Sequence, residues 1–364
     1  MFLNQEREKM PKRRRFSFNI DVVGVCNLHC PSCPTGNMRD SKRLKGLMEP
    51  DTLNRILAKA VTECDVAGVG LFNWAEPFLH PRLPALIRTV KSYGIPCQLS
   101  SNLNEMKNIK DVLSENPFSL RISLSGFNQQ VYGRSHRGGD IERVKKNMTA
   151  LAQAKKQLNS STQVHILYHR YKGNLEDELL MRDFSKHLGF SFVPVWALMM
   201  PVSKILAYVG EAPEGVSIST DDLNVIDQLA LPLGAALTAS KKQDADSCTL
   251  QDNQMTIDHR GLVSLCCGVY EEKYNVGSYL ELTLDKLQAL KYQQNICKSC
   301  MSCGVQTYIT YGFPEMDRIA ADNIDPKYAK LLGLRYERLG KRFSETVQPA
   351  RDFLQRIIKF GRSM

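Results

Sequence analysis

The chain has 364 residues, of which 43% are hydrophobic and 24% are charged. These proportions are those of a globular protein and exclude a disordered or fibrous chain. The formal net charge is +10, and the two ends, residues 1–15 and 327–364, carry most of it, whereas the long middle is close to neutral. We therefore expect the ends to be solvated or to contact an anionic membrane surface or an acidic partner protein, and we expect no nucleic-acid partner.

Apolar, β-branched runs alternate with amphipathic runs over the first 200 residues. The predicted strands cover 16–25, 66–74, 95–100, 119–124, 164–169 and 190–197. The first predicted helix begins within 49–52 and ends near 64. The other predicted helices cover 82–93, 107–115, 141–156 and 175–188. Strands that alternate with helices through short connections are parallel and have right-handed crossovers. The fold class is therefore α/β, and we interpret the repeat as a partial (β/α)6 TIM-like barrel.

The pattern changes after residue 200. Residues 201–245 are less regular and are expected to hold one or two helices, and 255–257 and 262–265 flank Gly261 as in a β-hairpin. A helix is predicted at 282–292, before a compact run of cysteines. The predicted parts are a basic N-terminal arm at 1–15, the barrel at 16–230, a small cysteine-rich auxiliary-cluster domain at 246–312 and a basic helical tail at 325–364.

The cellular compartment is predicted from what the sequence lacks. No run approaches the ~20 apolar residues of a membrane span, and no apolar segment of signal-peptide length follows the basic residues 12–15. A cytoplasmic protein is expected, with association at a membrane surface through the basic ends as an option. Eleven cysteines in a reducing compartment favour metal binding or catalysis over disulfides.

Three cysteines follow the first predicted strand at Cys-x3-Cys-x2-Cys spacing, namely Cys26, Cys30 and Cys33. In parallel α/β proteins, the loops at this end of the strands form the active site. Three thiolates hold three corners of a [4Fe–4S] cluster and leave one iron open to a small chelating molecule. Zinc, with His29 as a fourth ligand, is the alternative, but a zinc loop does not explain the surrounding βα repeat.

The spacing, its position after strand one and the βα repeat resemble the radical S-adenosylmethionine (SAM) superfamily. The resemblance implies a cluster held by three cysteines, with SAM bound to the open iron. It also implies reductive cleavage of SAM to a 5′-deoxyadenosyl radical, which abstracts hydrogen from the substrate. Many members have an aromatic residue just before the third cysteine, where this chain has Ser32.

The same resemblance suggests cofactor contacts at the strand ends. Glu76 lies where members contact the methionine amino group, although Trp74 and Ala75 replace the usual glycines; a carboxylate that caps a helix is the alternative. Related enzymes often have Asp at the position of Ser125, and Arg137 suits either the cofactor carboxylate or a structural role. The predicted cofactor-binding residues are Glu76, Ser100, Asn102, Ser123, Ser125 and Arg137.

A second group of six cysteines lies late in the chain. Cys-x2-Cys-x2-Cys spacing is a strong metal-binding signal, and the hairpin between earlier cysteines resembles the twitch form of the SPASM extension of radical SAM enzymes. The resemblance implies one auxiliary [4Fe–4S] cluster, and zinc remains the alternative metal. Its expected ligands are Cys248, Cys266, Cys297 and Cys300, with Cys303 or Cys267 as a substitute ligand or a hydrogen-donating thiol.

These features predict an enzyme that abstracts hydrogen from a small-molecule or peptide substrate, with an oxidation assisted by the auxiliary cluster. Epimerisation or cross-link formation on a peptide is an alternative, and a non-catalytic zinc or iron–sulfur electron-transfer protein is an alternative class. An electron donor such as flavodoxin or ferredoxin is expected. The sequence identifies neither the substrate nor a catalytic side chain. His165 and His169 share one face of the fifth strand and line the substrate cavity if that face is interior.

Overall fold

The computed structural model describes residues 13–38, 45–243 and 247–333. Within these ranges, one sheet has the strand order β6-β5-β4-β3-β2-β1-β7-β8-β9. Strands β1 to β6 pair in parallel, β7 is parallel to β1, and β8 and β9 are antiparallel additions. The strands are β1 (Arg15–Ile20), β2 (Asp65–Gly70), β3 (Cys97–Ser101), β4 (Ser119–Leu124), β5 (Gln163–Arg170), β6 (Ser191–Trp196), β7 (Gln254–Ile257), β8 (Leu262–Ser264) and β9 (Asn275–Ser278).

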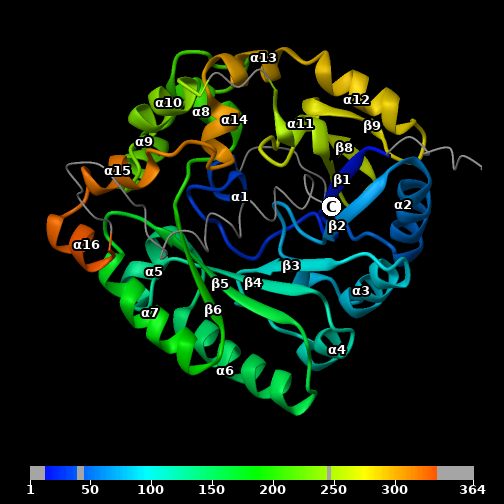
Figure 1. Ribbon diagram of the computed structural model, residues 1–364, viewed down its shortest axis with the longest axis horizontal. Coiled ribbons are helices and arrows are strands. Elements are labelled where there is room, and N and C mark those ends of the chain that lie inside the picture. Colours follow the sequence, from blue (N-terminus) through cyan, green and yellow to red (C-terminus); the bar gives the residue numbers. More distant parts are fainter. Residues whose placement is uncertain (1–12, 39–44, 244–246, 334–364) are drawn as a thin grey trace, which may run out of the picture.

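The predicted partial barrel is confirmed: the sheet curves around α1, and α2, α3, α4, α6 and α7 lie along its outside (Figure 1). The helices of this part are α1 (Pro34–Asn37), α2 (Pro50–Glu63), the 3-10 helix η1 (Pro77–Leu79), α3 (Leu83–Ser92), α4 (Ile109–Ser114), α5 (Gln129–Ser135), α6 (Ile141–Gln157) and α7 (Leu175–His187). The later helices are α8 (Val202–Tyr208), α9 (Thr220–Gln228), α10 (Leu233–Lys241), α11 (Thr249–Asn253), η2 (Glu272–Tyr274), α12 (Leu284–Tyr292), α13 (Asn295–Ser302), α14 (Val305–Ile309), α15 (Met316–Ala321) and α16 (Pro326–Leu331).

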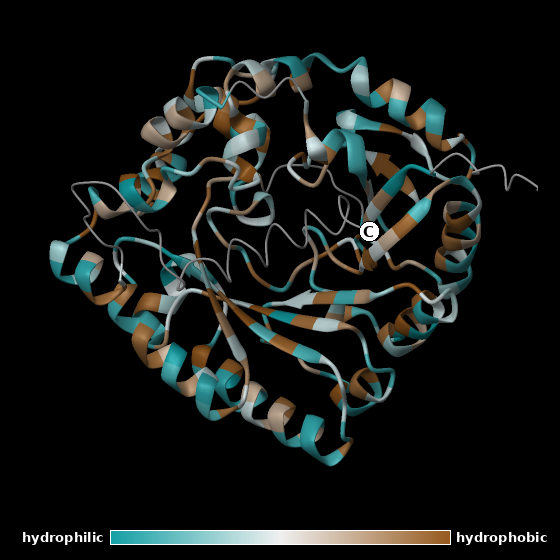
Figure 2. Cartoon of the chain, viewed as in Figure 1, coloured by the Kyte–Doolittle hydropathy of each residue, from teal (hydrophilic) through white to brown (hydrophobic). Residues whose placement is uncertain are grey.

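The strands bury one face more completely than the other. In β3 and β4, Leu99, Leu120 and Ile122 have no exposed surface, whereas their neighbours Ser100 and Arg121 keep part of theirs. Hydrophilic and hydrophobic residues accordingly alternate along the sheet and the outer helices (Figure 2). Because the helices cover the outside, the alternation gives the barrel an apolar outer core and a polar inner face.

Several predicted boundaries differ from the structure. The first strand ends at Ile20 rather than near residue 25. The second strand ends early, at Gly70, because the backbone N–H groups of Asn73, Trp74 and Ala75 donate to the Asp21 carboxylate instead of a neighbouring strand. The region 201–245 holds α8, α9 and α10 where one or two helices are predicted.

The late part of the chain shares the sheet of the barrel. β7 lies beside β1, with Ser17 opposite Gln254 and Ile20 opposite Ile257. The predicted hairpin around Gly261 is confirmed, since β7 and β8 pair antiparallel across it. The division of the chain into domains stays a prediction.

The two basic ends fall mostly outside the described residues. Of the predicted arm at 1–15, residues 1–12 lie outside them, and of the predicted tail at 325–364, so do residues 334–364. The described part of the tail contains α16. None of the helices in the described ranges has both the length and the apolar character that crossing a membrane requires.

Candidate active site

Cys26, Cys30 and Cys33 lie in the loop between β1 and α1, at the carboxyl end of the parallel strands. Cys33 is the residue that precedes α1, and its backbone N–H donates to the carbonyl of Cys30 at 3.0 Å. The His29 N–H donates to the carbonyl of Arg137 at 2.9 Å, which attaches the loop to the segment after α5. The three thiols are therefore carried by one short loop that is anchored to the barrel wall.

Gly36 allows α1 to pack directly on this loop. A Cβ at Gly36 would lie 2.1 Å from the carbonyl oxygen of Cys30 and 2.6 Å from that of His29. Real Cβ atoms do not approach backbone oxygens this closely, so the loop requires glycine here.

The electrostatics of the loop suit a positively charged metal group. Burial, followed by the charge of Glu76, raises the pKa of Cys26 to about 12. Burial also raises the pKa of Cys30 well above its usual range, and Cys33 and Cys26 add to this shift. Thiols that repel one another as thiolates are stabilised in that form by bound metal.

Two N–H groups point at the sulfur of Cys26, from Leu28 at 3.4 Å and from the side chain of Asn102 at 3.7 Å. Hydrogen bonds to cluster sulfurs are one of the means by which proteins hold and tune such groups. The three thiols and these donors therefore fit an iron–sulfur cluster that leaves one iron without a protein ligand.

Glu76 is buried and fully engaged with the chain. Its carboxylate accepts hydrogen bonds from the N–H of Phe78 at 3.1 Å, the hydroxyl of Ser101 at 2.8 Å and the N–H of Asn102 at 2.8 Å. The alternative that it caps a helix is confirmed, since it caps η1. Burial raises its pKa to about 7. Direct contact between Glu76 and the cofactor stays a prediction. Glu76 holds the backbone of Asn102, and the Asn102 side chain contacts the Cys26 sulfur.

The predicted serines have different surroundings. Ser100 and Ser123 are half-buried on the inner face of the barrel. Ser125 is fully buried, and its hydroxyl hydrogen-bonds to that of Ser135 and, at 2.6 Å, to the Nδ1 atom of His136. The structure thus brings Glu76 and Asn102 to the cysteine loop, while Ser125 holds the end of α5.

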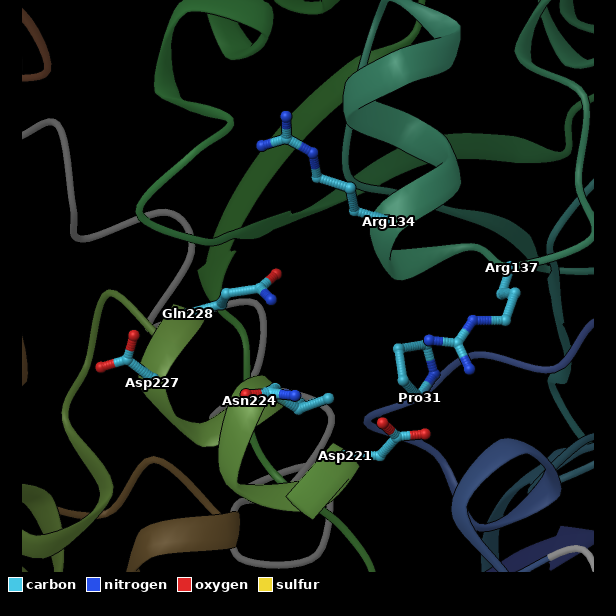
Figure 3. A pocket seen from close by; sticks show the side chains of 8 residues that line it. Pro31, Arg134, Arg137, Asp221, Asn224, Asp227 and Gln228 are labelled. Carbon is cyan, nitrogen blue, oxygen red and sulfur yellow. The ribbon is translucent and has the colours of Figure 1, made fainter.

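A pocket with a volume of 320 Å³ lies beside the cysteine loop. Figure 3 shows the Arg137 guanidinium beside Pro31, with the Asp221 carboxylate on the other side of that proline. The residues that line it are Pro31, Arg134, Arg137, Asp221, Asn224, Val225, Asp227 and Gln228. Of these, sequence reasoning identified only Arg137, since α9 reads as an ordinary amphipathic surface helix.

A second pocket of 310 Å³ shares Arg134 and Gln228 with the first. Its lining includes Tyr171, whose hydroxyl hydrogen-bonds to that of Ser32 at 3.0 Å. Ser32 is the residue that departs from the family pattern, and the structure places a tyrosine from the end of β5 against it. No local sequence signal links these two residues, which are 139 positions apart.

The six late cysteines come together from separate elements. Cys248 precedes α11, Cys266 and Cys267 follow β8, Cys297 and Cys300 lie on α13, and Cys303 directly follows that helix. Burial raises the pKa of Cys266 and of Cys300, and the charge of Cys248 raises both further. The N–H of Gly268 points at the Cys266 sulfur at 3.3 Å. This donor set also fits an iron–sulfur cluster.

As the side chains stand, no three His, Cys, Asp or Glu residues in the described ranges converge as the ligands of one metal ion do. The thiols of each group are thus within electrostatic reach of one another without closing on a single ion. The predicted ligand sets stay predictions.

Lys291 lies beside the late cysteines without any exposed surface. Its Nζ donates to the carbonyls of Gln251 and Gln254, both at 2.8 Å. Burial lowers its pKa to about 8, although the nearby cysteines Cys266 and Cys248 act in the opposite direction. The lysine therefore fixes the segment between Cys248 and β7.

Two intervening segments connect the two cysteine regions through hydrogen bonds. The indole N–H of Trp74, from the loop after β2, donates to the carbonyl of Val269, two residues after Cys267, at 3.0 Å. The N–H of Met200 donates to the carbonyl of Ser32 at 3.1 Å. The N–H of Val202 in turn donates to the carbonyl of Gly268 at 2.9 Å, so the segment before α8 connects the first cysteine loop to the segment after Cys267.

Comparisons with known proteins agree with this geometry. A family model described as "Radical SAM superfamily" matches residues 20–177. The fold is similar to that of SuiB from Streptococcus suis bound to precursor peptide SuiA, with a TM-score of 0.52, 15% identity and coverage of 80% of this chain and 67% of that one. It is similar to native anSMEcpe with bound AdoMet, with a TM-score of 0.53, 14% identity and coverage of 87% and 99%.

A search of curated proteins found no match. The matched segment 20–177 begins at the last residue of β1 and contains β2 to β5 and all three cysteines of the first group. This match identifies residues 20–177 as a radical SAM domain, and the barrel and the position of its cysteine loop agree with it.

Proposed function

We propose that this enzyme cleaves SAM at a cluster held by Cys26, Cys30 and Cys33, and that it oxidises a small-molecule or peptide substrate with the help of one auxiliary cluster. When bound, the first cluster and SAM supply the radical that abstracts hydrogen, and the second accepts an electron from the substrate. The observation that carries the proposal is the contact between the cysteine loop, Asn102 and the pocket of Arg137.

The pocket offers charges of both signs to the amino-acid end of SAM. Arg137 suits its carboxylate and Asp221 suits its ammonium group, since a guanidinium binds a carboxylate through two parallel hydrogen bonds. Glu76 acts as a positioning residue in this proposal: it holds Asn102 against Cys26. Ser100 and Ser123 lie on the inner face, where they are available to the ribose or the substrate.

We assign the auxiliary cluster to Cys248, Cys266, Cys297 and Cys300, with Cys267 and Cys303 as the competing ligands. Support comes from the electrostatic effect of Cys248 on Cys266, Cys297 and Cys300. The Trp74–Val269 hydrogen bond joins this region to the barrel. An electron donor such as flavodoxin or ferredoxin would reduce the first cluster.

The substrate class has support from two sides. Two solved structures of similar fold contain peptides, SuiA with SuiB and Cp18Cys with anSMEcpe. The two pockets of this chain, of 320 and 310 Å³, are also of a size that suits a small metabolite. We therefore propose testing short peptides first and polar metabolites second.

Anaerobic reconstitution of the full chain tests the proposal. About eight iron and eight sulfide per chain are expected for two clusters, as is substrate-dependent formation of 5′-deoxyadenosine with a product lighter by two hydrogens. The Cys300→Ala variant is expected to lose about half of the iron and all product, and to retain cleavage of SAM. The Cys303→Ala variant is the matched control, since Cys303 lies on the same helix end.

Other outcomes would decide between the alternatives. A product of unchanged mass would favour epimerisation over oxidation. Equal iron loss in the two variants would contradict the ligand assignment. Bound zinc without 5′-deoxyadenosine would favour a non-catalytic metal protein and overturn the proposal.

A further inference from the structure

Arg121, in the middle of β4, faces the inside of the barrel. It pairs in register with Ser100 on β3 and with His165 on β5, so the three side chains share one face of the sheet. Its neighbours Leu120 and Ile122 are fully buried on the outer face, whereas Arg121 is partly exposed. A strand residue with this alternation points away from the outer core and towards the interior.

The guanidinium reaches the carboxyl end of the barrel. It lies 4.3 Å from the centroid of the Phe72 ring, and Phe72 comes two residues after the end of β2. Gly70 makes room for this ring, because a Cβ there would lie 2.8 Å from it. Arg121 therefore presents its charge at the same end of the barrel as the cysteine loop.

No acidic partner neutralises this charge in the described part of the chain. No ion pair or hydrogen bond of Arg121 is found there, and its Nε atom is covered and unpaired. Burial lowers its pKa to about 10. Burial, followed by the charge of Arg121, lowers the pKa of His165 and lowers that of His169 to about 4. Its titratable neighbours are thus bases that stay neutral.

A partly buried guanidinium with a covered, unpaired Nε atom costs a fold free energy, and an anion that binds there during function explains why it is retained. The Phe72 ring occupies one face of the guanidinium, and the edge formed by its two Nη groups, unlike the covered Nε atom, is available. That edge matches a carboxylate, to which it donates two parallel hydrogen bonds.

We propose that Arg121 is a specificity-determining residue that binds a carboxylate of the substrate inside the barrel. The proposal rests on the function proposed above and deepens it by naming the substrate class. His169 and Ser123, half-buried on the inner face of neighbouring strands, are placed to contact the rest of the same group. The carboxylate belongs either to a free organic acid or to an Asp or Glu side chain of a peptide.

Calorimetric titration of the reconstituted full-length enzyme with SAM present tests this site. The probes are glutarate, with the neutral glutaramide as its control, and a hexapeptide with one Asp, with the Asn peptide as its control. The wild type is expected to bind at least one acid in preference to its amide. Arg121→Gln is expected to weaken that binding by about tenfold or more, because the bound carboxylate loses its charge pair with the guanidinium. Arg121→Lys is expected to retain part of it, because the charge remains.

Arg143→Gln is the matched control, since Arg143 is exposed on α6; it is expected to bind like the wild type. Melting temperature provides a second measurement that does not depend on the probe. Removal of an unpaired, partly buried charge is expected to leave the melting temperature of Arg121→Gln equal or higher, whereas a purely structural arginine would lower it.

The two arms identify the source of the carboxylate: glutarate binding indicates an organic acid, and Asp-peptide binding indicates a peptide. The inference is overturned if neither acid is preferred to its amide, if Arg121→Gln binds as the wild type does, or if that variant raises only the KM for SAM. An enzyme that cleaves SAM without this acid preference leaves the proposed function standing. Acid binding through Arg121 without cleavage of SAM contradicts the proposed function instead.

Discussion

The two cysteine regions are built in different ways. Cys26, Cys30 and Cys33 fall within eight consecutive positions of one loop, which Gly36 and the Arg137 carbonyl fix in place. The later cysteines reach one region from the start of α11, the end of β8 and helix α13. The first region is therefore determined mainly by local sequence, and the second by packing between distant segments.

This difference has a consequence for stability. A loop carried by a well-packed parallel sheet keeps its thiols near one another even when no metal is bound. A region assembled from several short elements depends on each contact between them, such as those of Lys291 with Gln251 and Gln254. We therefore expect the two regions to respond differently to single substitutions.

The largest expected effect comes from Cys30→Ala. Loss of one of three cluster ligands should abolish 5′-deoxyadenosine formation while the later region retains its metal, so that iron falls to about half. Cys97→Ala is the control, because Cys97 is a fully buried residue of β3 away from the loop. Iron analysis and chromatography of the nucleoside products provide the measurement. Complete loss of iron in Cys30→Ala would show that the two regions do not form independently.

Gly36→Ala tests whether the first loop is held by local packing. The new Cβ would collide with the Cys30 carbonyl, so we expect most SAM cleavage and about half of the iron to be lost. Gly133→Ala, on α5, is the matched control, since a Cβ there meets only the Gln129 side chain at 3.4 Å. Wild-type activity in Gly36→Ala would mean that the loop has another conformation in the working enzyme.

Lys291→Met tests the dependence of the second region on distant contacts. Two buried carbonyls would lose their donor, which should lower the free energy of unfolding by about 2 kcal/mol, and metal in the later region should be bound less tightly. The exposed Lys286→Met on the same helix is the control. Urea denaturation and iron retention against a chelator measure the two effects. A variant as stable as the wild type would contradict the role of this lysine.

His169→Gln is expected to have a smaller, pH-dependent effect on the barrel between the regions. The pKa of His169 is lowered to about 4 by burial and then by the charge of Arg121, so the unfolded chain binds its proton first as the pH falls. The stability that neutral His169 contributes is thus complete above about pH 6.5 and is lost progressively towards pH 4, at no more than about 1.4 kcal/mol per pH unit.

The variant should lose less stability than the wild type on acidification. Urea denaturation at several pH values between 4 and 7.5 measures the difference. Parallel curves for the two proteins would mean that His169 titrates normally.

Sequence patterns predicted the parts that depend on local signals. The six parallel strands follow from apolar periodicity, and the first cysteine loop follows from its spacing and its place after a strand. The short polar helix α5 and the third helix of 201–245 lack such signals.

The site residues that escaped prediction depend on the tertiary structure. Tyr171 hydrogen-bonds to Ser32, and Asp221 lines a pocket with Pro31 of the cysteine loop, because the barrel brings distant segments of the chain together. For Glu76, the structure confirms the predicted alternative of a helix cap and adds a support for Asn102, while the cofactor contact that the family resemblance indicates stays a prediction.

The most direct test of the central claim is the reductive cleavage of SAM by the reconstituted wild-type chain under anaerobic conditions. We expect 5′-deoxyadenosine and methionine to form in equal amounts in the wild type and in Cys97→Ala, and not in Cys26→Ala, Cys30→Ala or Cys33→Ala. Wild-type chain that carries a full complement of iron and sulfide but forms no 5′-deoxyadenosine, or a loop variant that forms as much as the wild type, would contradict it.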